Sequence, residues 1–159
     1  MLSEHLDKVT VPNQAPIKQV GGADDPGLHI GYLVTGVRTR MMQEMDTCLA
    51  PYGLTGAQFV ILRRIAEGVA TTAADLCRVL DYDTGSMTRM LDRLEEKCVI
   101  LRVRSSDDRR VINIQLTEQG AQQYPKLKEE VSRVFNQRLS CLSERELEQL
   151  HGMLQRLAK

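Results

Sequence analysis

Arginine and lysine are concentrated in one short stretch of a chain whose charges otherwise balance. Residues 97–116 contain five Lys and Arg residues against two Asp residues, a net charge of +3. The cations are Lys97, Arg102, Arg104, Arg109 and Arg110. A guanidinium group donates paired hydrogen bonds to phosphate oxygens and to the edge of guanine, so this stretch is suited to binding nucleic acid.

A second group of cations lies just before this stretch, on a segment with helical spacing. At about 100° per residue, Met87, Leu91, Leu94 and Cys98 fall on one side of a helix. The opposite flank carries Ser86, Arg89, Arg93 and Lys97, with Glu96 as its only acid, and Asp92 and Glu95 lie to the side. The alternative is an ordinary solvated face, but arginines at i and i+4 repel each other unless an anion binds. The pattern therefore favours a helix that contacts DNA.

The whole chain has 159 residues, with 21 Lys and Arg against 21 Asp and Glu, and 42% of its residues are hydrophobic. Zero net charge argues against a uniformly basic, histone-like protein, and the apolar content argues against an acidic disordered one. No segment reaches the roughly 18 apolar residues of a membrane helix, and residues 1–16 contain no export signal. We expect a cytoplasmic protein without a membrane partner.

Metal, cofactor and enzyme chemistry are not indicated. Four cysteines, Cys48, Cys77, Cys98 and Cys141, lie far apart without a CxxC pair, and the three histidines are scattered. We expect no metal and no cofactor, and we expect the first three cysteines to be small core residues. No nucleophile–base pair, glycine-rich phosphate loop or pair of catalytic carboxylates is apparent, so we expect no enzymatic activity.

Three short helices and a hairpin are predicted to position the cations. Thr55 and Gln58 form a capping box for a helix ending near Gly68, Thr72 with Asp75 begins a helix over 73–80, and Asp83 caps a helix to about Lys97. Short breaks between them indicate a helix-turn-helix. Residues 100–104 and 111–116 then read as two strands joined by the polar tip 105–109, which completes a winged helix-turn-helix.

Amphipathic helices are predicted on both sides of this unit. Apolar residues recur with helical spacing from Ile30 to Cys48, Thr117 caps a later helix, and Ser143 with Glu146 forms a second capping box. A small core does not readily bury both apolar stripes, so we expect a homodimer, with a monomeric bundle as the alternative. The fold class is mainly α with a small β-hairpin, a winged helix-turn-helix flanked by dimerisation helices.

The predicted organisation is a flexible arm over residues 1–27 and a single domain over 28–159. Within it, residues 54–116 form the DNA-binding lobe, and 28–50 and 117–159 form the dimerisation helices.

Three stretches carry a family resemblance: LTGAQFVILRRI at 54–65, GSMTRMLDRLEEK at 85–97 and DDRRVINIQLTEQG at 107–120. With them, the sequence resembles the MarR family, regulators named for multiple antibiotic resistance, over roughly residues 30–157. The resemblance implies a bacterial or archaeal cytoplasmic homodimer. Each subunit of such a dimer reads half of a near-palindromic DNA operator.

The resemblance also implies roles for individual residues. Those matching the recognition helix are Thr84, Ser86, Thr88, Arg89 and Arg93. In the wing, Arg110 enters the minor groove, Asp108 orients it through an ion pair, and Arg104 and Arg109 contact phosphates.

Many family members release DNA when a phenolic or aromatic carboxylate binds, and the resemblance implies the same here. Thr88, Arg93 and Arg102 match residues that contact a salicylate-like anion, although the two arginines could instead serve DNA alone. The candidate pocket walls are Met41, Met42, Met45, Phe59 and Tyr124, although methionines at helical spacing are more often dimer core. Two other functions stay open: a thiol-based redox regulator of the same fold, and a winged-helix protein-interaction module without DNA binding.

One position departs from the family pattern. Cys98 stands after the recognition helix, where the family usually has a glycine. Glycine adopts the left-handed conformation at low cost, so we expect the helix to end differently here.

Overall fold

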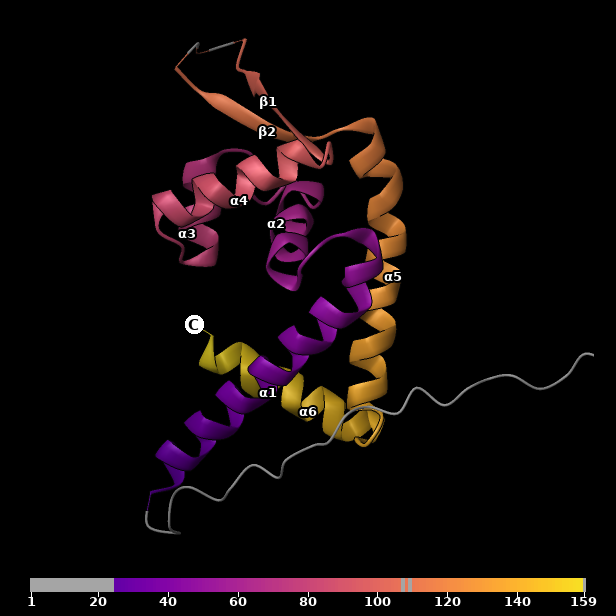
Figure 1. The fold of residues 1–159 in the computed structure, drawn as a ribbon. Coiled ribbons are helices and arrows are strands. Elements are labelled where there is room, and N and C mark those ends of the chain that lie inside the picture. The colour runs from indigo at the N-terminus through magenta and orange to yellow at the C-terminus, as the bar shows by residue number, and fades with distance from the viewer. Residues whose placement is uncertain (1–24, 107, 109, 159) are drawn as a thin grey trace, which may run out of the picture. The chain divides into compact units, whose positions relative to one another are not determined.

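The computed structural model describes residues 25–106, 108 and 110–158. Its elements follow the order helix, short 3₁₀ turn, three helices, hairpin and two helices (Figure 1). They are α1 (Pro26–Leu49), η1 (Ala50–Tyr52), α2 (Gly56–Ala66), α3 (Ala73–Leu80), α4 (Thr84–Glu96), β1 (Ile100–Arg104), β2 (Ile112–Leu116), α5 (Glu118–Leu139) and α6 (Glu144–Leu157). The predicted fold class is confirmed. No helix within the described ranges is long and apolar enough to cross a membrane.

The chain divides into two compact units, residues 1–39 and 40–159. In the first unit, the described residues belong almost entirely to the N-terminal part of α1. Apolar side chains there are exposed, namely Leu28, Ile30, Tyr32, Leu33, Val34 and Val37. The predicted arm falls largely on residues 1–24, outside the described residues, and the predicted domain division stays a prediction.

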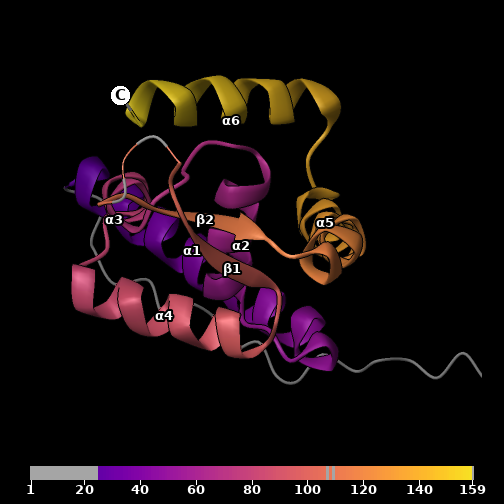
Figure 2. The ribbon, with the colours of Figure 1, turned by 90° about the horizontal axis from the view of Figure 1, so that it is seen from above.

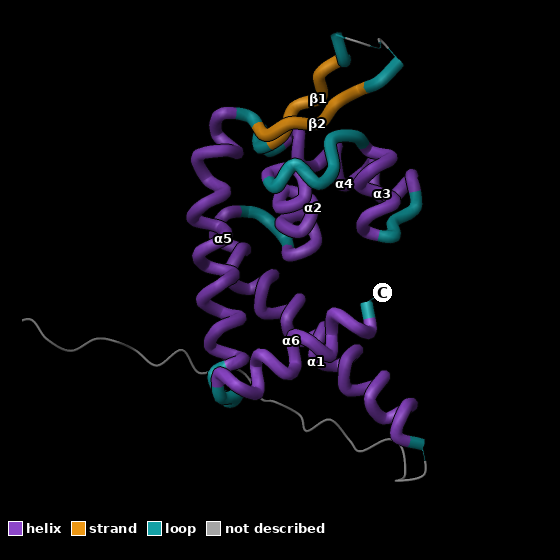
Figure 3. The backbone as a smooth tube through the Cα atoms, turned by 180° about the vertical axis from the view of Figure 1, so that it is seen from behind, coloured by secondary structure: helices purple, strands orange, loops and turns teal. Residues whose placement is uncertain are grey.

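The second unit has one hydrophobic core beneath the hairpin, between α2, α4 and α5 (Figure 3). Met87, Leu91 and Leu94 of α4 are fully buried, as their spacing predicts. The other fully buried large side chains are Leu49, Ile61, Leu62, Leu76, Ile100 and Leu127. Burial of one stripe of α4 leaves its remaining faces available for other contacts.

Local capping chemistry sets where the helices begin. Thr55 accepts a hydrogen bond from the Gln58 backbone N–H at 3.2 Å, and the Gln58 side chain accepts one from the Thr55 N–H at 3.1 Å. Ser143 and Glu146 form the same reciprocal pair at the start of α6. Asp83 caps α4 by accepting from the Ser86 N–H at 2.8 Å. These predicted helix starts are confirmed because each depends on residues only three positions apart.

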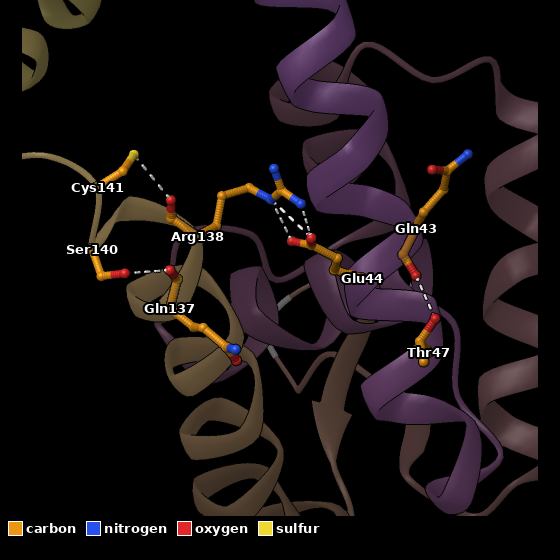
Figure 4. A network of polar contacts seen from close by, with 7 residues as sticks. All are labelled: Gln43, Glu44, Thr47, Gln137, Arg138, Ser140 and Cys141. Carbon is orange, nitrogen blue, oxygen red and sulfur yellow. Dashed lines mark hydrogen bonds and ion pairs between the residues drawn. The ribbon is translucent and has the colours of Figure 1, made fainter. Parts of the chain in front are cut away.

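A bidentate ion pair joins the second half of α1 to the end of α5 (Figure 4). The Arg138 Nε atom donates to both carboxylate oxygens of Glu44 at 2.8 Å, and Arg138 Nη2 donates to one of them. Both side chains are about 29% exposed. Shielding from water strengthens such a planar pair, so it sets the position of α5 against this part of α1.

The hairpin is antiparallel and pairs Ile100 with Leu116 and Arg104 with Ile112. β2 begins at Ile112, one residue later than predicted. A bridge between Thr72 and Asn113 and a 2.7 Å hydrogen bond from the Ile114 N–H to the Thr71 carbonyl tie β2 to the start of α3. The hairpin is therefore held by the helix-turn-helix as well as by its own pairing.

α4 ends in a left-handed residue, although that residue is not glycine. Cys98 has a φ of 57°, the conformation that a glycine adopts at low cost. Its carbonyl accepts a hydrogen bond from the Thr117 hydroxyl at 2.6 Å, which holds the turn in place. The expectation that the helix ends differently is wrong, because Cys98 adopts the conformation that the glycine would supply.

The glycine of the Leu-Thr-x-x-Gly motif has a packing reason. A Cβ atom built on Gly120 would lie 3.0 Å from the carbonyl carbon of Val99 and closer still to its oxygen. That carbonyl also accepts a hydrogen bond from the Thr117 N–H at 3.2 Å, and Thr117 caps α5 by accepting from the Gly120 N–H. The first turn of α5 therefore packs directly on the backbone that follows α4.

Replacing Gly120 with alanine should lower the free energy of unfolding by at least about 2 kcal/mol, because the added methyl group meets backbone that cannot turn aside. The matched control is Gly152→Ala in α6, where a Cβ atom meets nothing within 4 Å. Alanine has the higher helix propensity, so this control should keep or slightly raise stability. Urea unfolding followed by circular dichroism measures both, and equal stability of the two variants would contradict the packing argument.

Candidate nucleic-acid interface

The N-terminal half of α4 presents hydroxyl and guanidinium groups outward. Thr84, Thr88 and Arg89 are exposed, and Ser86 is half-buried. The Ser86 hydroxyl accepts a hydrogen bond from Arg89 Nη2 at 3.2 Å, and Thr88 donates to the Thr84 carbonyl at 2.8 Å. Hydrogen bonds from Ser86 lower the pKa of the capping Asp83, so this carboxylate stays ionised. The helix start is thus rigid and carries polar groups of the kind that contact base edges and phosphates.

Three exposed guanidinium groups on α4 and the hairpin have no partner among the residues that the structure describes. Within the described residues, the side chains of Arg93, Arg104 and Arg110 form no hydrogen bond or ion pair. Arg109, which is also predicted to contact DNA, lies outside the described residues. Unpaired, solvated guanidinium groups can bind an external anion without breaking an internal contact.

Arg102 behaves differently from these three. Its Nη2 atom donates to Asp92 at 2.7 Å, and its Nη1 atom donates to Glu95 at 2.6 Å. The pKa of Arg102 is raised by these two carboxylates although burial opposes the rise. A carboxylate ligand at Arg102, as predicted, would therefore share the guanidinium group with Asp92 and Glu95.

The wing contact expected between Asp108 and Arg110 has a different form. The Asp108 carboxylate accepts a hydrogen bond from the backbone N–H of Arg110 at 2.9 Å. Among the ion pairs of the described residues, none joins these two side chains. Asp108 thus shapes the turn that carries Arg110 and leaves the guanidinium group unpaired.

Lys97 does not belong to the outward basic flank. Its ammonium group donates to the Gly53 carbonyl and, at 3.1 Å, to the Gln58 side chain. Gln58 is the buried half of the α2 capping box. Lys97 therefore links the end of α4 to the start of α2, a contact between segments that spacing along one helix does not reveal.

The cysteines divide by exposure. Cys48 and Cys77 are half-buried against the core, in line with prediction, whereas Cys98 is exposed and the prediction that it packs in the core is wrong. The cause is the left-handed turn at Cys98, which takes the chain away from the buried stripe of α4. Burial is the main cause that raises the pKa of Cys48, so its side chain stays protonated as a thiol.

The predicted effector-pocket residues meet in part between α2 and α5. The rings of Phe59 and Tyr124 stack with centroids 6.1 Å apart, and Met45 is buried in the same core. The Tyr124 hydroxyl and Arg64 Nε are both buried without a hydrogen-bond partner among the described residues. Arg64 is not among the residues predicted from the sequence, because nothing in its spacing shows that its Nε atom is buried.

Comparisons with known proteins agree on one family. The sequence model of the MarR family matches residues 54–112. An uncharacterised HTH-type transcriptional regulator of Bacillus subtilis, YpoP, is 30% identical over 137 residues, which cover 77% of this chain and 97% of that protein. The chain belongs to the MarR family.

Two solved structures of transcriptional regulators on DNA share this fold. A mutant of MarR from E. coli complexed with operator DNA is 28% identical, with a TM-score of 0.74, and covers 82% of this chain and 94% of its own. The transcriptional repressor CouR bound to a DNA duplex is 27% identical, with a TM-score of 0.75, and covers 82% and 92%. This MarR-family chain is a DNA-binding transcriptional regulator and not an enzyme.

Membership in this DNA-binding family removes one alternative. A winged-helix interaction module without DNA binding does not agree with the relatives, which are transcriptional regulators, or with the family structures on DNA.

Proposed function

We propose that this MarR-family protein is a repressor that releases a near-palindromic operator when a small phenolic or aromatic carboxylate binds. A homodimer presents two recognition helices, and each reads one half of the operator. Thr84, Ser86, Thr88, Arg89 and Arg93 serve as the base and phosphate contacts of α4, while Arg104, Arg109 and Arg110 serve as those of the wing. The proposed site of action is the cytoplasm.

The observation that carries the DNA-contact part is the contrast between paired and unpaired arginines. Arg63, Arg102 and Arg138 are tied to carboxylates, whereas Arg93, Arg104 and Arg110 are exposed with no side-chain partner among the described residues. Phosphate can engage the unpaired groups with no loss of internal ion pairs. The relatives on DNA supply independent support for the same lobe.

Exposed apolar residues support the homodimer. In the first unit, Ile30 is 53% exposed, and its neighbours along α1 are exposed as well. In the second unit, Met153, Leu154 and Leu157 are exposed on α6, which has no buried residue. Large exposed apolar side chains at helical spacing are typical of a face that another helix covers.

Replacing Arg110 with alanine should weaken binding to operator and to unrelated duplex alike, because the charge lies close to the DNA backbone. The slope of log K against log salt should become shallower by about 1. Fluorescence anisotropy at several salt concentrations measures the slope. Arg145→Ala, which removes an exposed charge at the start of α6, is the matched control. Unchanged binding by the Arg110 variant would rule out the wing contact.

The proposed effector site rests on the aromatic pair between α2 and α5. Phe59 and Tyr124 stack on each other, and the ring of an aromatic acid can stack on the same side chains. The Tyr124 hydroxyl, which has no partner among the described residues, can donate a hydrogen bond to the carboxylate of the acid. Desolvation raises the pKa of Tyr124, so its hydroxyl keeps the proton that such a bond requires. Thr88 and Arg93 lie on the exposed side of α4, and they are proposed as contacts of a second, separate site for the same class of ligand, as the family resemblance implies.

Titrating salicylate and hydroxybenzoates into the protein–operator complex should release DNA at millimolar concentrations or below. Tyr124→Phe keeps the stacked ring and removes the hydroxyl, so it should raise the half-release concentration about fivefold or more. Anisotropy of labelled operator reports release, and benzyl alcohol, which lacks the carboxylate, is the control ligand. If none of these compounds released the operator, the effector proposal would be wrong, whereas the DNA-binding proposal would be unaffected.

The exposure of Cys98 favours a redox-responsive regulator as the second candidate. Peroxide should then release DNA from the wild type and from Cys48→Ser, because the burial that raises the Cys48 pKa makes that thiol a poor nucleophile. Cys98→Ser should not respond. Release that persists in every single Cys→Ser variant would exclude a mechanism that depends on one thiol.

A further inference from the structure

The recognition helix carries more acid than base, which is unexpected for a segment that approaches phosphates. Between Thr84 and Glu96, two arginines stand against Asp92, Glu95 and Glu96, a net charge of −1. Like charges brought together across an interface cost several kcal/mol in general. Something outside this helix must reduce its negative charge if it is to dock on DNA.

All three carboxylates lie near the proposed DNA contacts, and two of them, Asp92 and Glu95, flank Thr88. At roughly 100° per residue, Asp92 falls between Thr88 and Arg89 on the outward side of the helix, and Glu95 falls beside Thr88. Their side chains are 48% and 41% exposed. Both carboxylates therefore face water on or near the side that the exposed threonines and arginines share.

Arg102 reaches both carboxylates from the neighbouring strand. β1 begins next to the end of α4 (Figure 2), and the Arg102 guanidinium group places one nitrogen 2.7 Å from Asp92 and another 2.6 Å from Glu95. The Arg102 backbone N–H also donates to Glu95 at 3.3 Å. At 28% exposure, the Arg102 side chain is more shielded from water than either partner. The planar guanidinium group suits two carboxylates at once, which a lysine cannot match.

We propose that Arg102 is a positioning residue for DNA binding, which neutralises Asp92 and Glu95 so that an acidic recognition helix can approach phosphate. The inference rests on the proposed DNA-contact face of α4. We call Arg102 with Asp92 and Glu95 the charge clamp, and the net charge of α4 together with Arg102 is zero. The charge clamp also occupies the carboxylate of Asp92, which as an i+3 neighbour could otherwise pair with Arg89.

The charge clamp should matter more for DNA affinity than for stability. Ion pairs with partly exposed partners contribute little to the free energy of folding. Two uncompensated carboxylates at a DNA surface, in contrast, repel phosphate directly. The decisive measurement is therefore whether removing the carboxylates repairs the loss caused by removing Arg102.

Operator binding by fluorescence anisotropy, at several salt concentrations, tests this in the full chain. Arg102→Gln should raise Kd about tenfold or more at 0.1 M salt. Adding Asp92→Asn and Glu95→Gln to that variant should return Kd to within about threefold of wild type. Arg133→Gln, which breaks the exposed Arg133–Glu130 pair on α5 at 2.8 Å, is the matched control and should bind like wild type.

A triple variant that binds as weakly as Arg102→Gln would overturn the proposal and assign Arg102 a purely structural role. Should Arg102→Gln fail to fold, the variant with only Asp92→Asn and Glu95→Gln decides. We expect it to bind at least as tightly as wild type, with a salt slope steeper by about 1, and weaker binding would overturn the proposal. Arg93→Ala separates a failure of this inference from a failure of the proposed function, because unchanged binding by that variant would argue against the proposed DNA-contact face of α4.

Discussion

The close approach of α5 to the backbone of Val99 is the constraint on which the rest of the second unit depends. Gly120 leaves room for the Val99 carbonyl, and Thr117 donates to the Cys98 carbonyl while capping α5. One junction thereby sets the end of the recognition helix, the start of the hairpin and the origin of α5. Because no side chain can be inserted there, these three elements have little freedom to shift relative to one another.

Charge pairing divides the arginines of this unit between support and recognition. Arg138 holds the second half of α1 to α5, and Arg102 holds β1 to the recognition helix. Arg93 and Arg110, which share the unit with them, keep exposed guanidinium groups. The zero net charge of the chain is therefore an average over acidic and basic surfaces. A regulator of this kind should bind weakly to DNA that lacks its operator sequence.

Local features were predictable and contacts between distant segments were not. The caps at Thr55, Asp83 and Ser143 depend on side chains three residues apart, so the sequence locates them directly. The wheel of α4 placed Asp92 and Glu95 to the side but could not show that Arg102 would reach them. Helical spacing likewise places Lys97 on the outward flank, because it cannot show contacts with Gly53 and Gln58, which lie some forty residues earlier in the chain.

The helix-turn-helix, the hairpin, the buried stripe of α4 and the family resemblance can all be read from the amino-acid sequence, because periodicity, capping and motif spacing are properties of short segments. Which arginines are available to an external anion becomes visible only once the segments are packed together. The packing also exposes Cys98 and leaves the Tyr124 hydroxyl buried without a partner among the described residues. The physical reason is that exposure and pairing depend on which segments meet, and charge and apolarity along one segment do not specify that meeting.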